Sequence, residues 1–552
     1  MCCGGHGSVN SPGLNLHVAK ASPAMIHGFI LFRYDVGMTS TPAAFPSSDS
    51  SVQRPAGTAR VLAVLRIIML VALFSVAALH EARHLQSLTD PGVWLQLRTG
   101  NWILTHHSLP RSGLFSRLDT LHWTDATWGS QVLLAALYRL IGLRAIPVAQ
   151  MVFGVLFAIS AFLLAGGRRG GFWLAVLLSG CAQLAMVPSL AQFQLLNATL
   201  LSAELWMLFA SRASGRRNLL FFVPLLMLFW ANLDWHFVFG LLVLFLFLGA
   251  EVAAQLLGDK VRVSMDAPVP PFRLALIATL SLIASVLTPY SYLSYSVAWQ
   301  NWFGETEQAI APELKAMDFR TPEHYLLMLL AMLAFLALGR QHLKDIFKVT
   351  LLVLCASISF AMQRDAWMVV VVSVAILGEV LFPYASRPEE PSDSSRGSSW
   401  VVAVCVLVVF GVSVAQIPAK TETLLEVTSR KLPVRACDFI RQNHLPAPIY
   451  NELSWGDFLT WYLPDYPVSI DDRYELYGDE NLTPYYEVMA GMRASSLDPE
   501  FASANTILLG RENNLLGVPE TYPNPEEVFQ KVFPGFQQVY RDDVAVVLTK
   551  PR

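Results

Sequence analysis

Charged residues are scarce in this sequence of 552 residues. Asp, Glu, Lys and Arg together make up 15% of the chain, whereas hydrophobic residues make up 54%. The mean hydropathy of +0.45 is above the range of soluble globular proteins. No basic tract accompanies the formal net charge of −3, so the composition gives no indication of a nucleic-acid partner. The scarcity of charge excludes an ordinary soluble domain and indicates a membrane protein.

The sequence has only six cysteines, and their positions exclude the structures that cysteine pairs usually stabilise. Cys2 and Cys3 open the chain, three cysteines lie within apolar segments, and Cys437 stands alone in the C-terminal region. A lone cysteine cannot form a disulfide within its own domain, and no C-x-x-C spacing is present for a zinc site. We therefore expect no structural disulfide.

Long hydrophobic runs, in contrast, are abundant. About 20 predominantly apolar residues cross the hydrocarbon core of a bilayer, and the sequence contains eleven such segments. They are approximately 61–79, 145–166, 171–188, 191–211, 218–232, 236–257, 273–289, 323–340, 346–362, 366–384 and 399–417. A further apolar segment, 128–146, is short and carries Arg139 and Arg144, so we predict an interfacial helix there.

The loop charges predict the orientation of these spans, because Lys and Arg remain preferentially on the cytoplasmic side. Arg60 and Arg66 open the first span, and Arg168 and Arg169 follow the second. With eleven crossings, this pattern places the N-terminus inside and the C-terminus on the external face. The loop between the first two spans, 80–127, is then external as well.

The composition divides the chain into three regions. Residues 1–56 are rich in Ser, Pro, Ala and Gly and are predicted to be a disordered leader, with Met38 as an alternative start. Residues 57–417 form the predicted transmembrane domain. Residues 418–552 alternate short strands and helices, which predicts a small α/β domain. The expected strands are Pro448–Tyr450, Val468–Ile470, Thr506–Leu509 and Val544–Leu548, and the expected helices are Val434–Asn443 and Pro525–Phe533.

The first external loop carries an ordered set of motifs. Asp90 begins the pattern D-P-x-x-W-x-x-x-x-x-G-x-W-I-L, Pro110 begins P-R-x-x-x-F-S, and Trp123 begins W-x-x-x-x-W. Two further motifs follow in the C-terminal region, W-G-x-F-L-x-W over Trp455–Trp461 and P-V-x-I-D-x-R over Pro467–Arg473. In their order and spacing these motifs resemble a poorly characterised branch of bacterial GT-C-type membrane glycosyltransferases, which depend on polyprenyl-phosphate sugars.

The resemblance implies a fold, a reaction and a location. The fold is an α-helical polytopic membrane protein with a GT-C-like bundle and a small external α/β domain. The reaction is inverting transfer of a sugar from a polyprenyl-phosphate donor to an acceptor glycan, lipid or protein, at the external face of a bacterial inner membrane. Membrane lipids, the lipid-linked donor and the acceptor are the implied partners, and a divalent metal ion is a candidate cofactor.

Asp90 is the candidate general base. An acceptor hydroxyl must lose a proton as it attacks the anomeric carbon of the sugar, and a carboxylate at the membrane surface can accept that proton. The structural alternative is that Asp90 caps a helix that Pro91 begins. A capping carboxylate can still face a cleft, so the two roles are compatible.

Asp234 is the candidate second acid. It lies in the segment from Asn232 to His236 between two predicted spans, where relatives have Asn-Leu-His. Ionisable residues at the membrane boundary are costly and often functional. The structural alternative is a solvated turn that joins two helices.

The remaining candidates are substrate-binding residues. A planar guanidinium suits the phosphate of a lipid-linked donor, and acids beside an arginine at the end of a strand mark a binding edge in α/β domains. The structural alternatives are aromatic membrane anchors and local Asp–Arg pairs. These candidates are Trp94, Arg98, Arg111, His122, Asp125, Asn232, His236, Arg320, Arg364, Asp471, Asp472 and Arg473.

The first loop also departs from the family's pattern. Gln96, Gly113 and Thr127 stand where relatives have a histidine, an acid and a glutamate, although Asp125 lies close to Thr127. These losses weaken the prediction of a metal. They favour the alternative of a non-catalytic membrane protein that binds or scaffolds an envelope glycan assembly. A transporter is a third alternative, but no paired half-repeats support it.

Overall fold

The computed structural model describes residues 56–167, 171–186, 193–213, 217–257, 269–304, 312–341, 345–385, 394–489, 492–511 and 533–551. The predicted leader up to residue 55, Arg168 and Arg169, and nearly all of the predicted helix Pro525–Phe533 lie outside the described residues. The chain from Gly57 to Arg552 forms one compact unit.

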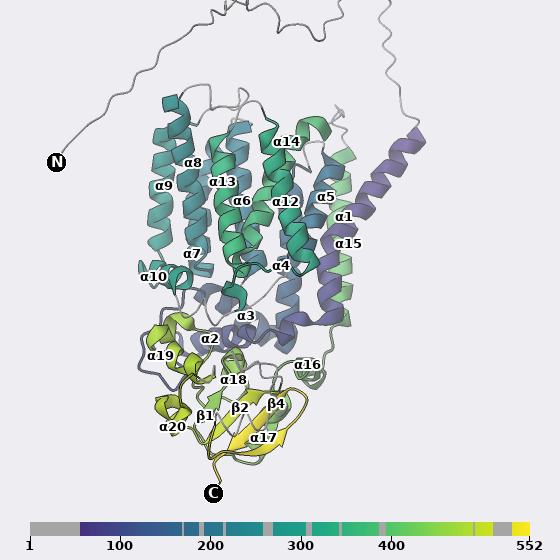
Figure 1. The fold of residues 1–552 in the computed structure, drawn as a ribbon. Helices are drawn as coiled ribbons and strands as arrows, with labels where there is room; N and C mark the ends of the chain where they lie inside the picture. Colours follow the sequence, from purple (N-terminus) through teal and green to yellow (C-terminus); the bar gives the residue numbers. More distant parts are fainter. Residues whose placement is uncertain are drawn as a thin grey trace, which may run out of the picture. The chain divides into compact units, whose positions relative to one another are not determined.

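Apolar helices run side by side through the upper part of this unit (Figure 1). They are α1 (Ala56–His84), α4 (Ala145–Leu164), α5 (Phe172–Ala185), α6 (Gln194–Ala213), α7 (Val223–Leu233), α8 (Phe237–Leu257), α9 (Pro271–Val286), α12 (Pro322–Gly339), α13 (Ile346–Ala361), α14 (Trp367–Ala385) and α15 (Ser394–Gln416). Each of them overlaps one of the predicted spans. The predicted α-helical polytopic membrane fold is therefore confirmed.

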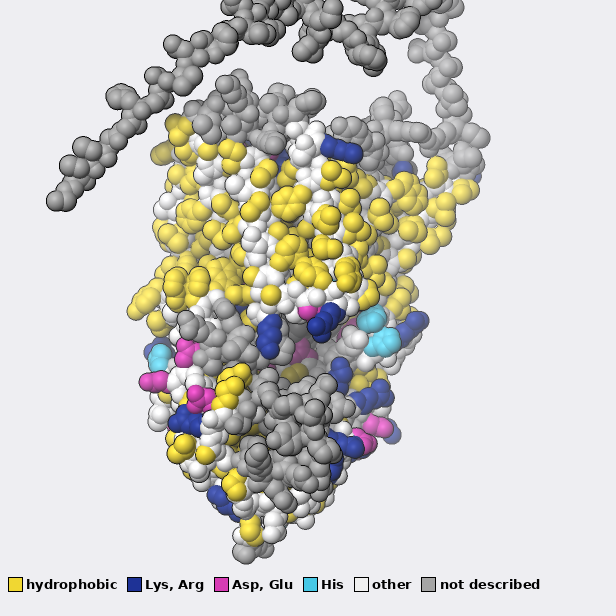
Figure 2. Space-filling view, in the orientation of Figure 1, with side chains coloured by type: hydrophobic (Ala, Val, Ile, Leu, Met, Phe, Trp, Pro, Cys, Tyr) yellow, Lys and Arg dark blue, Asp and Glu magenta, His cyan; other side chains and the backbone are white. Residues whose placement is uncertain are grey.

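A hydrophobic belt covers the face of the bundle seen in Figure 2. Figure 2 shows hydrophobic side chains over the helices, with charged side chains gathered below them. In α1 and in α15, only 17% of the most apolar stretch of 18 residues is buried within the protein. Leu407 on α15, for example, is 69% exposed. Apolar surface of this extent is stable in contact with lipid rather than water.

The helix that follows Thr127 directly does not lie among the helices of the bundle. An apolar helical stretch from Trp128 to Leu164 has 37 residues, which at about 1.5 Å per residue is far longer than one span requires. It divides at a short turn, Gly142–Arg144, into α3 (Trp128–Ile141) and α4. Helix α3 lies against α2 (Gly92–His106) at the lower end of the bundle in Figure 1, as expected for an interfacial helix.

The C-terminal region, residues 418–552, is here called the tail. It contains a four-stranded sheet in the order β1-β2-β4-β3. Strands β1 and β2 are parallel, and the other two pairs are antiparallel. The strands are β1 (Ile449–Asn451), β2 (Thr506–Gly510), β3 (Gln537–Arg541) and β4 (Ala545–Thr549). The tail helices are α16 (Thr421–Thr428), α17 (Val434–Gln442), α18 (Gly456–Tyr462), α19 (Tyr474–Met489) and α20 (Pro499–Ser503).

The strand predictions are confirmed for β1, β2 and β4, and wrong for Val468–Ile470. Val468 does not pair with the sheet. It forms an isolated bridge to Ser116 of the first loop, in which the Val468 backbone N–H donates to the Phe115 carbonyl. Strand β3 was not expected, since its exposed residues Gln537 to Arg541 have no apolar alternation. The helix Val434–Asn443 is confirmed as α17.

The first loop forms a layer between the bundle and the tail. The ring of Trp94 on α2 packs edge-on against Phe458 of α18, with 5.3 Å between centroids. The Arg117 backbone N–H donates to the Val468 carbonyl at 2.9 Å, and its guanidinium pairs with Glu500 at 2.9 Å. The loop therefore positions the tail relative to the membrane helices.

Replacement of Gly100 by Ala should destabilise this layer. A Cβ at Gly100 would lie 2.1 Å from the carbonyl oxygen of Gln131 on α3, which forces the two helices apart. We expect a loss of about 1–3 kcal/mol in the free energy of unfolding, measured as a lower unfolding temperature in detergent.

Gly249→Ala on α8 is the matched control, because nothing lies within 4 Å of a Cβ there. That variant should keep or slightly raise the unfolding temperature, since Ala favours a helix over Gly. Equal unfolding temperatures for the two variants would contradict the close α2–α3 packing.

Candidate functional site

A cleft of about 650 Å³ lies where the bundle, the first loop and the tail meet. Figure 2 shows acidic side chains in the hollow below the hydrophobic belt. The cleft is lined by the carboxyl groups of Asp90, Asp125, Asp234, Glu313, Glu452, Asp457, Asp472 and Glu475 and by the guanidinium groups of Arg364 and Arg473. Carboxyl groups therefore dominate its charge.

Asp90 lines the cleft and bonds the first residue of α2, although the N-cap position is Pro91 and not Asp90 as predicted. Its Oδ1 accepts a hydrogen bond from the backbone N–H of Gly92 at 3.2 Å, and the side chain is half-buried. The positive end of the α2 dipole favours the ionised carboxylate. The hydrogen bond to α2 and a position in the cleft are thus compatible.

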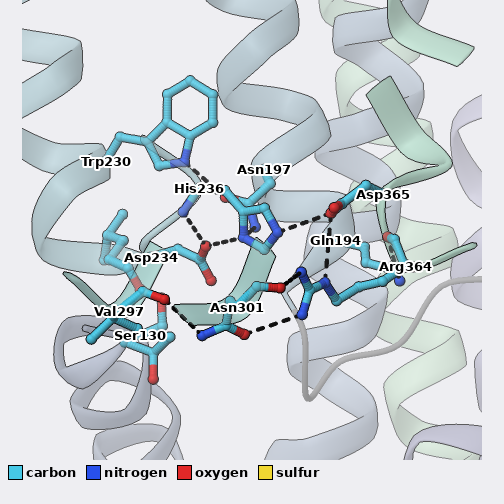
Figure 3. Close-up of polar contacts among 12 residues, drawn as sticks. Ser130, Gln194, Asn197, Trp230, Asp234, His236, Val297, Asn301, Arg364 and Asp365 are labelled. Atoms are coloured by element: carbon cyan, nitrogen blue, oxygen red, sulfur yellow. Dashed lines mark hydrogen bonds and ion pairs between the residues drawn. The ribbon is translucent and has the colours of Figure 1, made fainter. Parts of the chain in front are cut away.

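Asp234 and His236 form a buried turn between α7 and α8, so the predicted solvated turn is wrong. Asp234 is 1% exposed and His236 is 2% exposed. Asp234 Oδ1 accepts from the His236 backbone N–H at 2.9 Å and also contacts His236 Nδ1 (Figure 3). The other ring nitrogen, Nε2, lies 3.2 Å from Asp365 Oδ1. The imidazole is therefore held between two carboxyl groups.

Arg364 is the cation at the membrane end of the cleft. It lies in a short 3-10 turn, Gln363–Asp365, between α13 and α14. Its Nη1 and Nη2 donate to the side-chain and backbone oxygens of Asn301, both at 3.1 Å, and its guanidinium lies 5.0 Å from the centroid of the Trp235 ring. The predicted pair with Asp365 exists at 3.7 Å. These contacts fix the guanidinium beside the Asp234 turn (Figure 3).

The tail supplies the opposite wall. Arg473 is paired with Asp471 through two hydrogen bonds, of 2.9 and 2.6 Å, and lies 4.6 Å from the centroid of the Trp123 ring. The indole N–H of Trp123 donates to Glu475 at 3.0 Å. Asp471 thus has a structural role, and the charge of Arg473 is already largely neutralised.

Burial raises the pKa of most acids in this wall. The pKa of Asp125 is raised to about 7, and those of Asp457 and Asp472 lie well above the ordinary value, because burial and neighbouring carboxylates both disfavour ionisation. Burial also raises the pKa of Glu313 and Glu475. These groups therefore bind their protons more tightly in the folded protein than exposed carboxyl groups do.

The structure places the predicted site residues in two groups. Those that line the cleft are Asp90, Asp125, Asp234, His236, Arg364, Asp472 and Arg473. Four of the residues outside the lining have structural contacts or are buried: Trp94 packs against the tail, Arg98 lies over the Phe115 ring, Asn232 donates to backbone carbonyls, and Asp471 is buried. The other three, Arg111, His122 and Arg320, are exposed.

Several lining residues were not predicted. Glu452 and Asn301 are single polar residues with no motif around them, so no sequence pattern marks them. Asp457 stands inside the W-G-x-F-L-x-W motif, and Asp365 directly follows the candidate Arg364. The neighbouring residues could therefore have marked these two. Asp365 does not itself line the cleft, but it contacts two residues that do.

The described residues do not fit the candidate divalent metal. In the described ranges, no group of three or more His, Cys, Asp or Glu side chains is arranged to hold a metal ion.

The stability of the protein should fall with rising pH through Asp125. An acid whose pKa is raised by folding, here from 3.8 to about 7, binds its proton more tightly in the folded state. Its stabilising contribution is complete below pH of about 4 and lost by about pH 7, and amounts to up to about 4 kcal/mol. Asp125→Asn removes this titration, so the unfolding temperature of the wild type should fall relative to the variant over that interval.

Asp119→Asn, at an exposed position in the same loop, gives the background for this comparison. Parallel pH curves for the wild type and Asp125→Asn would show that Asp125 does not bind its proton more tightly on folding.

Comparison with known proteins supports the fold. No model of a protein family and no curated protein matches the sequence. The apo oligosaccharyltransferase of Archaeoglobus fulgidus matches with a TM-score of 0.51 at 12% identity, over 84% of this chain and 70% of that protein. AglB from the same organism, with an inhibitory peptide and a dolichol-phosphate, gives 0.49 at 10% identity over 82% and 69%. ArnT from Cupriavidus metallidurans with undecaprenyl phosphate gives 0.42 at 14% identity over 90% and 98%. The first of these similarities shows that the chain has the GT-C-like fold its motifs predict.

Proposed function

We propose that the protein transfers a sugar from a polyprenyl-phosphate donor to an acceptor glycan, lipid or protein at the external face of a bacterial inner membrane. One observation carries this proposal. Asp90, Asp234 and Arg364 come from three distant segments and line the same cleft at the end of the membrane helices. Two acids and a cation at a lipid boundary match the needs of a phosphate-linked glycosyl donor.

Asp90 acts as the general base in this proposal. Its Oδ1 is engaged by the Gly92 N–H, and the dipole of α2 favours its ionised form. An ionised carboxylate beside an acceptor hydroxyl takes the proton as the oxygen attacks the anomeric carbon. The bond from that carbon to the phosphate oxygen breaks in the same displacement, so the anomeric centre is inverted.

Asp234 serves as the second acid and orients the acceptor. Its Oδ1 is occupied by His236, whereas its Oδ2 accepts no hydrogen bond within the described residues. Because Asp234 lines the cleft, the second oxygen is available to acceptor hydroxyls. Arg364 binds the phosphate that leaves with the lipid.

The helix beside Arg364 supports a donor that approaches from the lipid. Helix α10 (Leu293–Phe303) presents Val297 and Asn301 to the cleft. Trp299 and Phe303 on this helix are 65% and 58% exposed. Exposed aromatic side chains of this kind are favoured at membrane–water interfaces. A polyprenyl chain outside α10 would bring its phosphate close to Arg364.

The alternative is a non-catalytic protein that binds or scaffolds an envelope glycan assembly. It is favoured by two lining residues, Gln96 and Thr127, which stand where the resembled family has a histidine and a glutamate. The two functions differ in turnover, since a scaffold binds a glycan without consuming a donor.

Asp90→Asn should abolish sugar transfer. Purified protein in lipid vesicles would be given a panel of labelled polyprenyl-phosphate sugars and crude envelope acceptors. We expect the variant to lose about 10²–10⁴-fold in transfer rate, because an amide cannot accept the proton. Asp119→Asn, in the same loop but outside the cleft lining, should retain transfer. Full activity in Asp90→Asn would reject the base, and no transfer by folded wild type across the panel would favour the scaffold.

Arg364→Gln should raise the KM for the donor by about 10-fold or more, because a buried charge-assisted contact to phosphate is lost. Arg320→Gln is the control, since Arg320 is exposed and outside the cleft lining. Donor titrations of both variants at saturating acceptor would measure the change. An unchanged KM in Arg364→Gln would place the phosphate elsewhere.

A further inference from the structure

The imidazole of His236 makes more contacts than a neutral ring can satisfy. Asp234 Oδ1 contacts Nδ1, and Asp365 Oδ1 lies 3.2 Å from Nε2. A neutral imidazole has one N–H, so one of these contacts would set a ring lone pair against a carboxylate oxygen. Both contacts are favourable when both ring nitrogens carry a proton.

The surroundings of the ring allow this charged form. The groups that face His236 are Asp234 in its own turn, Asp365 in the Gln363–Asp365 turn, and the side-chain amide of Asn197 on α6. The Nδ2 of Asn197 is a donor 3.3 Å from Nδ1 and accepts nothing from a protonated Nδ1, so the closer Asp234 Oδ1 is the acceptor of that proton. The remaining faces are covered by aromatic rings. These are Trp235, Phe239 and Trp367, with centroids 3.8, 5.8 and 5.8 Å from that of the imidazole. Two carboxylates with an imidazolium and the nearby Arg364 form a neutral set.

Asp365 is held rigidly, although it does not line the cleft. It is fully buried, and its backbone carbonyl accepts from the Ser359 hydroxyl at 2.8 Å. The same hydroxyl accepts from the Val369 N–H at 3.2 Å, which ties the turn to the start of α14. Asp365 Oδ1 also lies 3.7 Å from Arg364 Nε. One carboxylate therefore contacts both the imidazole behind Asp234 and the guanidinium beside it (Figure 3).

We propose that Asp365 is a positioning residue of the transfer site, which holds His236 as a doubly donating imidazolium and thereby orients Asp234 toward the acceptor. The inference rests on the proposed function. The backbone N–H and the ring Nδ1 of His236 both contact Oδ1 of Asp234, which leaves Oδ2 for the substrate. Without the negative charge of Asp365, the ring gives up one proton near neutral pH, and Asp234 loses its side-chain partner or takes up that proton itself.

The test compares Asp365→Asn with a matched Asp–His pair on the surface. Asp318 Oδ1 lies 3.0 Å from His324 Nδ1, and Asp318 is exposed, so Asp318→Asn removes a similar contact without burial. We expect kcat of Asp365→Asn to fall about 10–100-fold at neutral pH, with partial recovery at lower pH and little change in the donor KM. Asp318→Asn should keep the wild-type pH profile.

A second readout does not depend on turnover. In protein labelled with ¹⁵N-histidine, His236→Gln identifies the His236 ring signals. Both ring nitrogens should be protonated in the wild type between about pH 6 and 8, and one proton should be lost in Asp365→Asn within that range. A single neutral tautomer in the wild type, or an unchanged pH profile in Asp365→Asn, would overturn the proposal.

The two readouts separate the two proposals. If the wild type shows the doubly protonated ring but transfers no sugar from any donor, the proposed reaction fails while the state of His236 stands. If transfer occurs and the ring is neutral, the reaction stands and Asp365 has no positioning role.

Discussion

The packing of the first loop between the membrane helices and the tail is the interaction on which the rest of the site depends. Trp94 packs against α18, and the backbone of Arg117 and Val468 joins the loop to the tail. Asp90 and Asp125 reach the cleft from this loop, and the tail closes the opposite side. If this layer shifted, the acids on the two walls would separate, and no single wall holds all the groups that the proposed reaction requires.

The second constraint is the concentration of carboxyl groups in a partly buried cleft. Burial, together with the neighbouring carboxylates, raises the pKa of Asp457 and Asp472 in the tail wall well above the ordinary value. At the membrane end, the lining residue Arg364 supplies a guanidinium, which lies 3.7 Å from Asp365. The cleft is therefore electrostatically polarised. This arrangement is consistent with the proposed function, in which an anionic donor head group binds at the membrane end and a hydroxyl-rich acceptor binds against the tail.

The sequence predicted the helical fold well, because each span is a long apolar run and the two arginines at the end of 128–146 disfavour a crossing. It predicted the core strands of the tail but not β3, whose exposed residues lack an apolar pattern. In the site, Asp90 and Asp234 could be found from motifs. Asp457 and Asp365 stand beside residues that the motifs marked, whereas nothing in the sequence marks Glu452. The positions of all three arise from segments that meet only in the folded chain. Val468 was misread as part of a strand of the sheet, because its backbone forms only an isolated bridge to Ser116 of the first loop.

The attachment of the tail at the end of α15 has a consequence for the strength of its docking. Arg144 from the turn after α3 donates to the carbonyl oxygens of Val414 and Ile417 at 2.9 and 2.7 Å, so the last turn of α15 is anchored to the same layer that the tail packs against. A domain tethered this close to its partner surface meets it at a high effective concentration, on the order of millimolar. Contacts too weak to join two separate proteins are then sufficient to keep the cleft closed.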